Sequence, residues 1–134
     1  MSKRVGKVKA ACIAIVFPIL AAGAASADVA AAMSRAKSGQ FDTSGEVRCA
    51  QEVGQALGTC RAEVARAGGA AVVTVSFANG FSRKLSFAER AFLRGNATMS
   101  GVGTDTDWSR KDGIFTVRVD DQRFVIDEVL VFGN

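Results

Sequence analysis

The fold is decided by the stretch Val72–Val73–Thr74–Val75–Ser76–Phe77–Ala78–Asn79–Gly80–Phe81–Ser82–Arg83–Lys84–Leu85–Ser86–Phe87. Two runs rich in β-branched and aromatic residues flank an Asn-Gly turn, which is typical of a β-hairpin. A two-residue loop at Asn79–Gly80 would mix polar and apolar side chains on both faces. A three-residue loop with Gly80 in the left-handed conformation pairs Val75 with Arg83 and gathers nearly all apolar residues on one face. We therefore predict the three-residue loop.

A second hairpin signal lies at Asp112–Gly113, between Trp108–Lys111 and Ile114–Val119. Asp-Gly suits a type I′ turn, and the two-residue register places Trp108 opposite Val117. The same register places Asp107 opposite Arg118, which gives an ionic cross-strand pair.

A further two-residue turn is predicted at Asp121–Gln122, where it pairs Val119 with Phe124 and Val117 with Ile126. Other strands are predicted over Gly45–Gln51, Arg61–Arg66, Ala70–Phe77 and Val129–Phe132. Six to eight short antiparallel strands indicate an all-β fold, either a small barrel or a two-layer sheet.

Two segments are less regular. Asp28–Ser38 favours a short N-terminal helix, with Asp28 as N-cap and Gly39 as its stop, although a flexible tail is the alternative over residues 28–44. Ala88–Arg94 fits either a single helical turn or a strand extension, and the sequence does not decide between them.

The first 27 residues are typical of a signal peptide. Four basic residues precede the apolar run Ala10–Leu20, and Ala25–Ser26–Ala27 is a small-residue cleavage site. We expect cleavage after Ala27, no stable membrane anchor afterwards, and a periplasmic or secreted domain over residues 45–134. Because the segment holds four of the 17 Lys and Arg and none of the 13 Asp and Glu, the remaining chain carries 13 of each and offers no basic surface for nucleic acid.

Cys49 and Cys60 remain after cleavage, and an exported chain meets oxidising conditions in which such a pair usually bonds. We therefore predict a structural disulfide. Closing a loop of this length stabilises the folded state by roughly 3 kcal/mol in the chain-entropy model.

The chain contains no histidine, which excludes Ser-His-Asp triads and histidine-ligated zinc. Acidic residues lie mainly in predicted turns, where Asp is favoured by its hydrogen bonds to the backbone. We expect no catalytic residues, no metal and no cofactor. A small carboxylate-dependent hydrolase is the alternative. Arg83 stands out, because the predicted register places it among apolar residues, where a guanidinium must be paired or reach the rim.

Several motifs together resemble a family of small exported proteobacterial β-domains that has no characterised activity. They are Cys49 with Cys60, Val64–Ala70, the Asn79–Gly80 turn, and Arg118–Phe124 continued to Gly133. The resemblance covers most of residues 46–133 and implies export and an all-β domain. The family's typical ending carries a proline near Asp127–Glu128, which this chain lacks. Ser100–Gly101 is also similar to the loop of periplasmic lysozyme inhibitors, which are small β-barrels, but the tyrosine that follows it there is missing.

The long polar stretch from Asn96 to Trp108 is predicted to be the binding loop, because loops on rigid β scaffolds often carry recognition. Its candidate contact residues are Asn96, Met99, Ser100, Gly101, Thr104, Asp105 and Trp108. The sequence thus predicts a non-enzymatic binding or inhibitory module whose partner is a protein or a cell-envelope component. It does not determine the partner or the oligomeric state.

Overall fold

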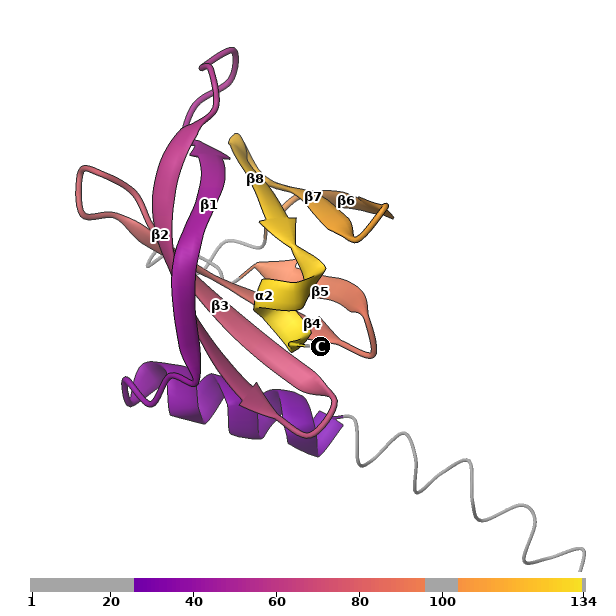
Figure 1. Ribbon diagram of the computed structural model, residues 1–134. Helices are drawn as coiled ribbons and strands as arrows, with labels where there is room; N and C mark the ends of the chain where they lie inside the picture. Colours follow the sequence, from indigo (N-terminus) through magenta and orange to yellow (C-terminus); the bar gives the residue numbers. More distant parts are fainter. Residues whose placement is uncertain (1–25, 96–103, 134) are drawn as a thin grey trace, which may run out of the picture.

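The computed structural model describes residues 26–95 and 104–133, which form one antiparallel sheet and two helical segments (Figure 1). The sheet order is β5-β4-β3-β2-β1-β8-β7-β6. The strands are β1 (Thr43–Ala50), β2 (Gly58–Ala67), β3 (Ala70–Ser76), β4 (Ser82–Ala88), β5 (Ala91–Gly95), β6 (Thr106–Lys111), β7 (Ile114–Val119) and β8 (Gln122–Asp127). The all-β prediction, with a short N-terminal helix, is confirmed.

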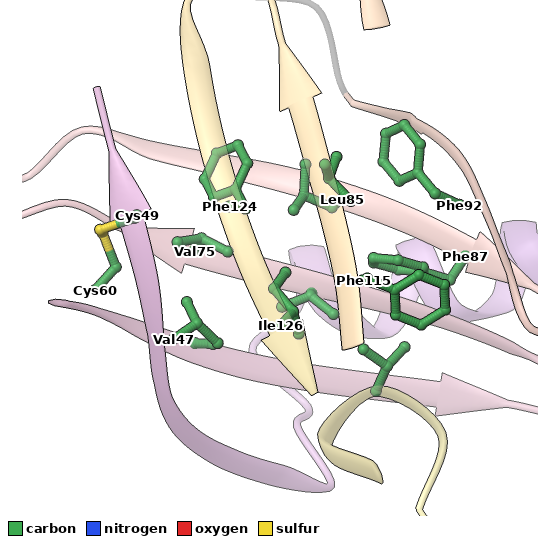
Figure 2. Packing of buried hydrophobic residues seen from close by; sticks show 14 of the residues in the cluster. Val47, Cys49, Cys60, Val75, Leu85, Phe87, Phe92, Phe115, Phe124 and Ile126 are labelled. Carbon is green, nitrogen blue, oxygen red and sulfur yellow. A yellow bond between two sulfur atoms is a disulfide. The ribbon is translucent and has the colours of Figure 1, made fainter. Parts of the chain in front are cut away.

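The sheet curls on itself, so that the apolar sides of β3 and β4 face those of β7 and β8 across one core (Figure 2). Phe87 of β4 lies with its ring centroid 4.9 Å from that of Phe115 on β7. Phe77, which follows β3, lies 5.8 Å from Phe124 on β8. These contacts make the sheet a nearly closed, barrel-like structure.

The β3–β4 hairpin has the predicted three-residue loop. Val75 pairs with Arg83 and Val73 with Leu85, and the N–H of Phe77 donates to the carbonyl of Phe81. Gly80 has φ +91°, the left-handed conformation that this loop requires. The larger apolar side chains Val73, Val75, Leu85 and Phe87 therefore point to the core, as expected, while Val72 lies on the outer face beneath the N-terminal helix.

The β6–β7 hairpin also has its predicted register, with Trp108 opposite Val117 and a turn at Asp112–Gly113. Both turn residues have positive φ, as a type I′ turn requires.

The turn between β7 and β8 is one residue earlier than predicted. Val117 pairs with Phe124 and Val119 with Gln122, so the turn residues are Asp120 and Asp121 rather than Asp121 and Gln122. Asp120 tolerates the left-handed conformation there (φ +52°). Moving the turn by one residue shifts the pairing by two, which leaves each side chain on its predicted face, so the apolar pattern alone does not reveal the error.

The predicted last strand is wrong: Val129–Phe132 lies in the short helix α2 (Glu128–Phe132). Periodicity in so short an apolar run does not distinguish helix from strand. In the folded chain, the guanidinium of Arg66 donates to the carbonyls of Leu130 (2.8 Å) and Val131 (2.9 Å). These are end carbonyls that lack intrahelical partners, so a contact distant in sequence satisfies the helix end.

Helix α2 covers one end of the core. Val131 is fully buried, and the Phe132 ring lies 6.3 Å from those of Phe87 and Phe115. The Glu128 carboxylate accepts from Arg90 at 2.6 Å and Arg110 at 3.1 Å. The helix is therefore held by apolar packing, by end-capping and by ion pairs.

The disulfide prediction is confirmed, since Cys49 of β1 and Cys60 of β2 are bonded with their Cα atoms 5.9 Å apart. The two strands are already neighbours, with Val47 opposite Cys60. The bond therefore fastens the base of the loop that connects β1 to β2. Strands expected over Gly45–Gln51 and Arg61–Arg66 correspond to β1 and β2.

The N-terminal helix runs through residues 26–37 and packs on the outer face of β2, β3 and β4 through small side chains such as Ala32 and Ala36. Gly39 ends it as predicted: its N–H donates to Ala36 and that of Gln40 to Arg35, a Schellman motif. Asp28 is not the N-cap, because the helix already includes residues 26 and 27. Its carboxylate instead accepts from the N–H of Gly69 at 3.1 Å.

Residues 88–94 extend the sheet and do not form a helical turn. Glu89 and Arg90 both have positive φ and connect β4 to β5. The predicted signal peptide lies almost entirely outside the described residues, and cleavage after Ala27 stays a prediction.

Replacing Gly80 with alanine should lower the free energy of unfolding by roughly 1 kcal/mol, because alanine resists the left-handed conformation. A Cβ at Gly80 would meet nothing within 4 Å, so the effect isolates backbone strain. Urea unfolding measures it. Gly69→Ala is the matched control: its site is equally open, its φ is not positive, and it should change stability little. Equal effects of the two substitutions would contradict the assigned turn.

Hydrogen bonding to Arg90 lowers the pKa of Glu128 below its usual 4.5. Because the folded-state pKa is depressed, its contribution to stability is present above pH 4.5 and is lost as the pH falls through the folded value. Glu128→Gln should therefore lose less stability between pH 7 and pH 3 than the parent does. Urea unfolding at both pH values tests this, with Glu52→Gln as an exposed control. An unchanged pH dependence in Glu128→Gln would refute a role for the Glu128 ion pairs with Arg90 and Arg110 in stability.

Candidate functional site

Consecutive antiparallel strands place their connections alternately at the two ends of the barrel. One end, which we call the loop end, carries the β1–β2 loop, the β3–β4 loop, residues 104 and 105, and the β7–β8 turn. The other end is covered by α2. The predicted binding loop thus connects two strands at the loop end.

The structure describes only part of that loop. Asn96, Met99, Ser100 and Gly101 lie outside the described residues, and their roles stay predictions. Thr104 donates its hydroxyl to the carbonyl of Gly95 at 3.3 Å. The loop is therefore joined to the end of β5 at the point where it enters β6.

Asp105 is held by a network with the β7–β8 turn. Its N–H donates to the Asp120 carboxylate at 2.9 Å, and its carbonyl accepts from the Asp120 N–H at 2.7 Å. Arg118 lies 3.3 Å from the Asp105 carboxylate and donates to the Asp120 carbonyl at 2.9 Å. These contacts fix the backbone of Asp105 while its side chain stays 81% exposed.

The network reaches the interior through Arg83, whose side chain is only 5% exposed. Its Nε donates to the Gln122 side-chain oxygen at 2.8 Å, and its Nη2 lies 3.8 Å from the Asp120 carboxylate. The guanidinium also lies 5.9 Å from the centre of the Phe81 ring. Arg83 is therefore paired, which is one of the two arrangements that the sequence predicted for it. Sequence reasoning missed Gln122 as its partner, because it placed that residue in the turn.

Trp108 does not belong to this network. It pairs with core-facing Val117 and its ring lies 6.1 Å from that of Phe115. Trp108 lies within β6, whereas Asp105 precedes the strand and is hydrogen-bonded to the β7–β8 turn. The structure therefore separates two residues that the sequence grouped into one loop.

A hollow of about 320 Å³ lies beside the disulfide at the loop end. The cysteines and Phe77 are nearly buried, and the polar side chains of Gln51, Gln55 and Asn79 line the rest. The Gln55 side-chain oxygen accepts from the N–H groups of Gln51 and Glu52, so it already serves to order the loop.

The carboxylates at this end are arranged for pairing with arginine. Asp105 faces Arg118 and Asp120 faces Arg83, and both carboxylates are open to solvent. The two carboxylates therefore form ion pairs with arginines at the open rim of the barrel. Within residues 26–95 and 104–133, no three acidic or cysteine side chains come close enough to hold a metal ion.

Comparison with models of known protein families, with curated proteins and with solved structures gives no match. The resemblances to the exported β-domains and to lysozyme inhibitors therefore stay predictions. Among the described helices, none has the length and apolar character to cross a membrane.

Replacing Gln122 with methionine should destabilise the protein by roughly 1 to 3 kcal/mol, because it removes an acceptor from the buried guanidinium of Arg83. Urea unfolding measures the loss. The double variant Arg83→Met with Gln122→Met should lose less than the sum of the two single variants, since both remove the same interaction. Additive losses would show that the two side chains are not coupled.

Proposed function

We propose that the protein is an exported, non-enzymatic binding module that recognises its partner at the loop end of the barrel. The observation that carries this proposal is the network from Asp105 through Arg118 and Asp120 to the buried Arg83. It anchors one end of the predicted binding loop to the barrel while leaving the Asp105 carboxylate exposed. Such a rigid base reduces the entropy lost when a loop binds.

The chemistry of the exposed side chains supports a protein or cell-envelope partner. Asp105, Asp120 and Arg118 present charges of both signs, and Phe81 is 38% exposed at the same end. Aromatic and arginine side chains are enriched in the energetically important parts of protein interfaces. Mixed charge favours a partner with a complementary pattern over a uniformly charged polymer.

The disulfide supports the proposed compartment. Such bonds persist in the periplasm or outside the cell and are rare in reducing compartments. Cys49 and Cys60 are bonded and nearly buried. A stable disulfide of this kind is compatible with a location in the periplasm or outside the cell.

Lysozyme inhibition is the specific activity to assay first. Ser100–Gly101 motivates it, and both residues lie outside the described part of the chain. The alternative of a carboxylate-dependent hydrolase is less favoured, because the loop-end carboxylates face arginines in open solvent.

Changing Met99, Ser100 and Asp105 together to alanine should abolish capture of a partner from periplasmic extract while shifting the melting temperature little. The exposed Asp105–Arg118 pair contributes little to stability, so loss of capture reports recognition.

The parent is purified from the periplasm. Its mass should show cleavage after Ala27, and it should have no thiol available for alkylation.

Asp127→Ala, an exposed change at the α2 end, is the control and should capture the partner normally. Lysozyme inhibition is assayed with the same proteins. Capture by the triple variant at the parent's level would place the recognition surface elsewhere. A free thiol at both cysteines in the exported protein would count against the compartment.

A further inference from the structure

A second surface feature lies away from the loop end, on the outside of the barrel. It is a groove of about 440 Å³ between the N-terminal helix and the edge formed by β4, its turn and β5. Its apolar lining comes from Val29, Ala30, Met33, Ala88 and Leu93. Its polar lining comes from Ser26, Lys37, Glu89 and Arg94. The volume lies within the range of small-molecule sites, roughly 300 to 1,000 Å³.

A β-bulge in β5 shapes one wall of the groove. Phe92 pairs with Phe87 and Arg94 pairs with Ser86, so Leu93 is an extra residue in β5. Phe92 points into the core, and Arg94 shares the outer side of Ser86. The bulge therefore lets both Leu93 and Arg94 line the groove, and it leaves Leu93 41% exposed.

The bulge also bears on what the groove can hold. β5 is the last strand of the sheet, and an edge strand can accept an added peptide strand. A bulge interrupts the regular ladder, and proteins use bulges to prevent such pairing. Recognition in this groove must therefore come mainly from side chains, which favours a small ligand over an extended peptide.

The charges of the groove are separated along its length. The Glu89 N–H donates to the Gly69 carbonyl at 3.0 Å, and the Asp28 carboxylate accepts from the Gly69 N–H, so the acidic groups lie near the first turns of the helix. Lys37 ends the helix about 14 Å beyond Asp28 along its axis, at about 1.5 Å per residue. Among the described residues, Lys37 and Arg94 form no ion pair. The groove thus combines apolar walls with two available cations.

We propose that this groove binds a medium-chain fatty acid. The acyl chain packs on Val29, Met33 and Leu93, and the carboxylate lies beside Lys37 and Arg94. Burial of the chain supplies affinity, and the two cations select an anionic head group over a neutral or cationic one. Cleavage after Ala27 would remove only Ser26 from the lining. The proposal goes beyond the proposed function and needs no partner at the loop end.

Isothermal titration calorimetry of the purified, processed protein with laurate below its micellar concentration tests the proposal. Laurate should bind, and dodecylammonium, which has the same chain and the opposite charge, should bind at least tenfold more weakly. Lys37→Gln combined with Arg94→Gln should weaken laurate binding by about tenfold, since each exposed charge contact contributes up to about fivefold. Leu93→Asp should also weaken it, by removing apolar contact and adding a like charge.

Arg48→Gln is the matched control, because it removes an exposed cation from β1, which three strands separate from β5 in the sheet. It should leave laurate binding unchanged, and melting curves should show that every variant is folded. Equal affinity for laurate and dodecylammonium, or full laurate affinity in the double variant, would overturn the proposal. So would capture of the protein by anionic lipid vesicles without binding of free laurate, because the ligand would then be a membrane surface.

Discussion

The structure depends on the contact between the two halves of one sheet across a shared core. Phe87 and Phe115 meet at 4.9 Å, and the closure continues to the far edge, where Gly95 of β5 lies against Val119 of β7. A Cβ at Gly95 would come within 2.8 Å of the Val119 side chain, so only glycine allows this approach. Without that closure, the apolar faces of β3, β4, β7 and β8 would be open to water.

Closing the sheet leaves two ends, and buried or capping arginines organise both. At the α2 end, Arg66 satisfies the last carbonyls of a helix too short to be stable alone. At the loop end, Arg83 enters the core and is satisfied by Gln122 and Asp120. A buried ion pair adds little net stability, because desolvation offsets much of the attraction, whereas removing one partner leaves a costly buried charge. The arginines therefore determine how the ends are built around a core that packs largely by apolar contact.

This arrangement keeps two surface regions apart. The loop end is a polar surface whose charged groups are already joined to one another and to the barrel. The outer groove has apolar walls and cations without ion pairs among the described residues, and it depends on a helix that lies outside the barrel (Figure 1). Recognition of a protein partner and binding of a small hydrophobic ligand require these two different kinds of surface. The two proposed binding sites therefore lie on separate surfaces of the domain.

The sequence by itself determined the fold class and the registers of the β3–β4 and β6–β7 hairpins, because these follow from local turn chemistry and the two-residue alternation of strands. It also determined the disulfide, because only two cysteines follow the predicted cleavage site and such a pair usually bonds under oxidising conditions. It also indicated that Arg83 needs a partner. Tertiary structure alone decided that Val129–Phe132 is helical, since Arg66 caps it from 64 and 65 residues away in the chain. It likewise decided the β7–β8 turn and the identity of Gln122 as the partner of Arg83. Both turn positions keep every side chain on the same face, so only contacts between distant strands distinguish them.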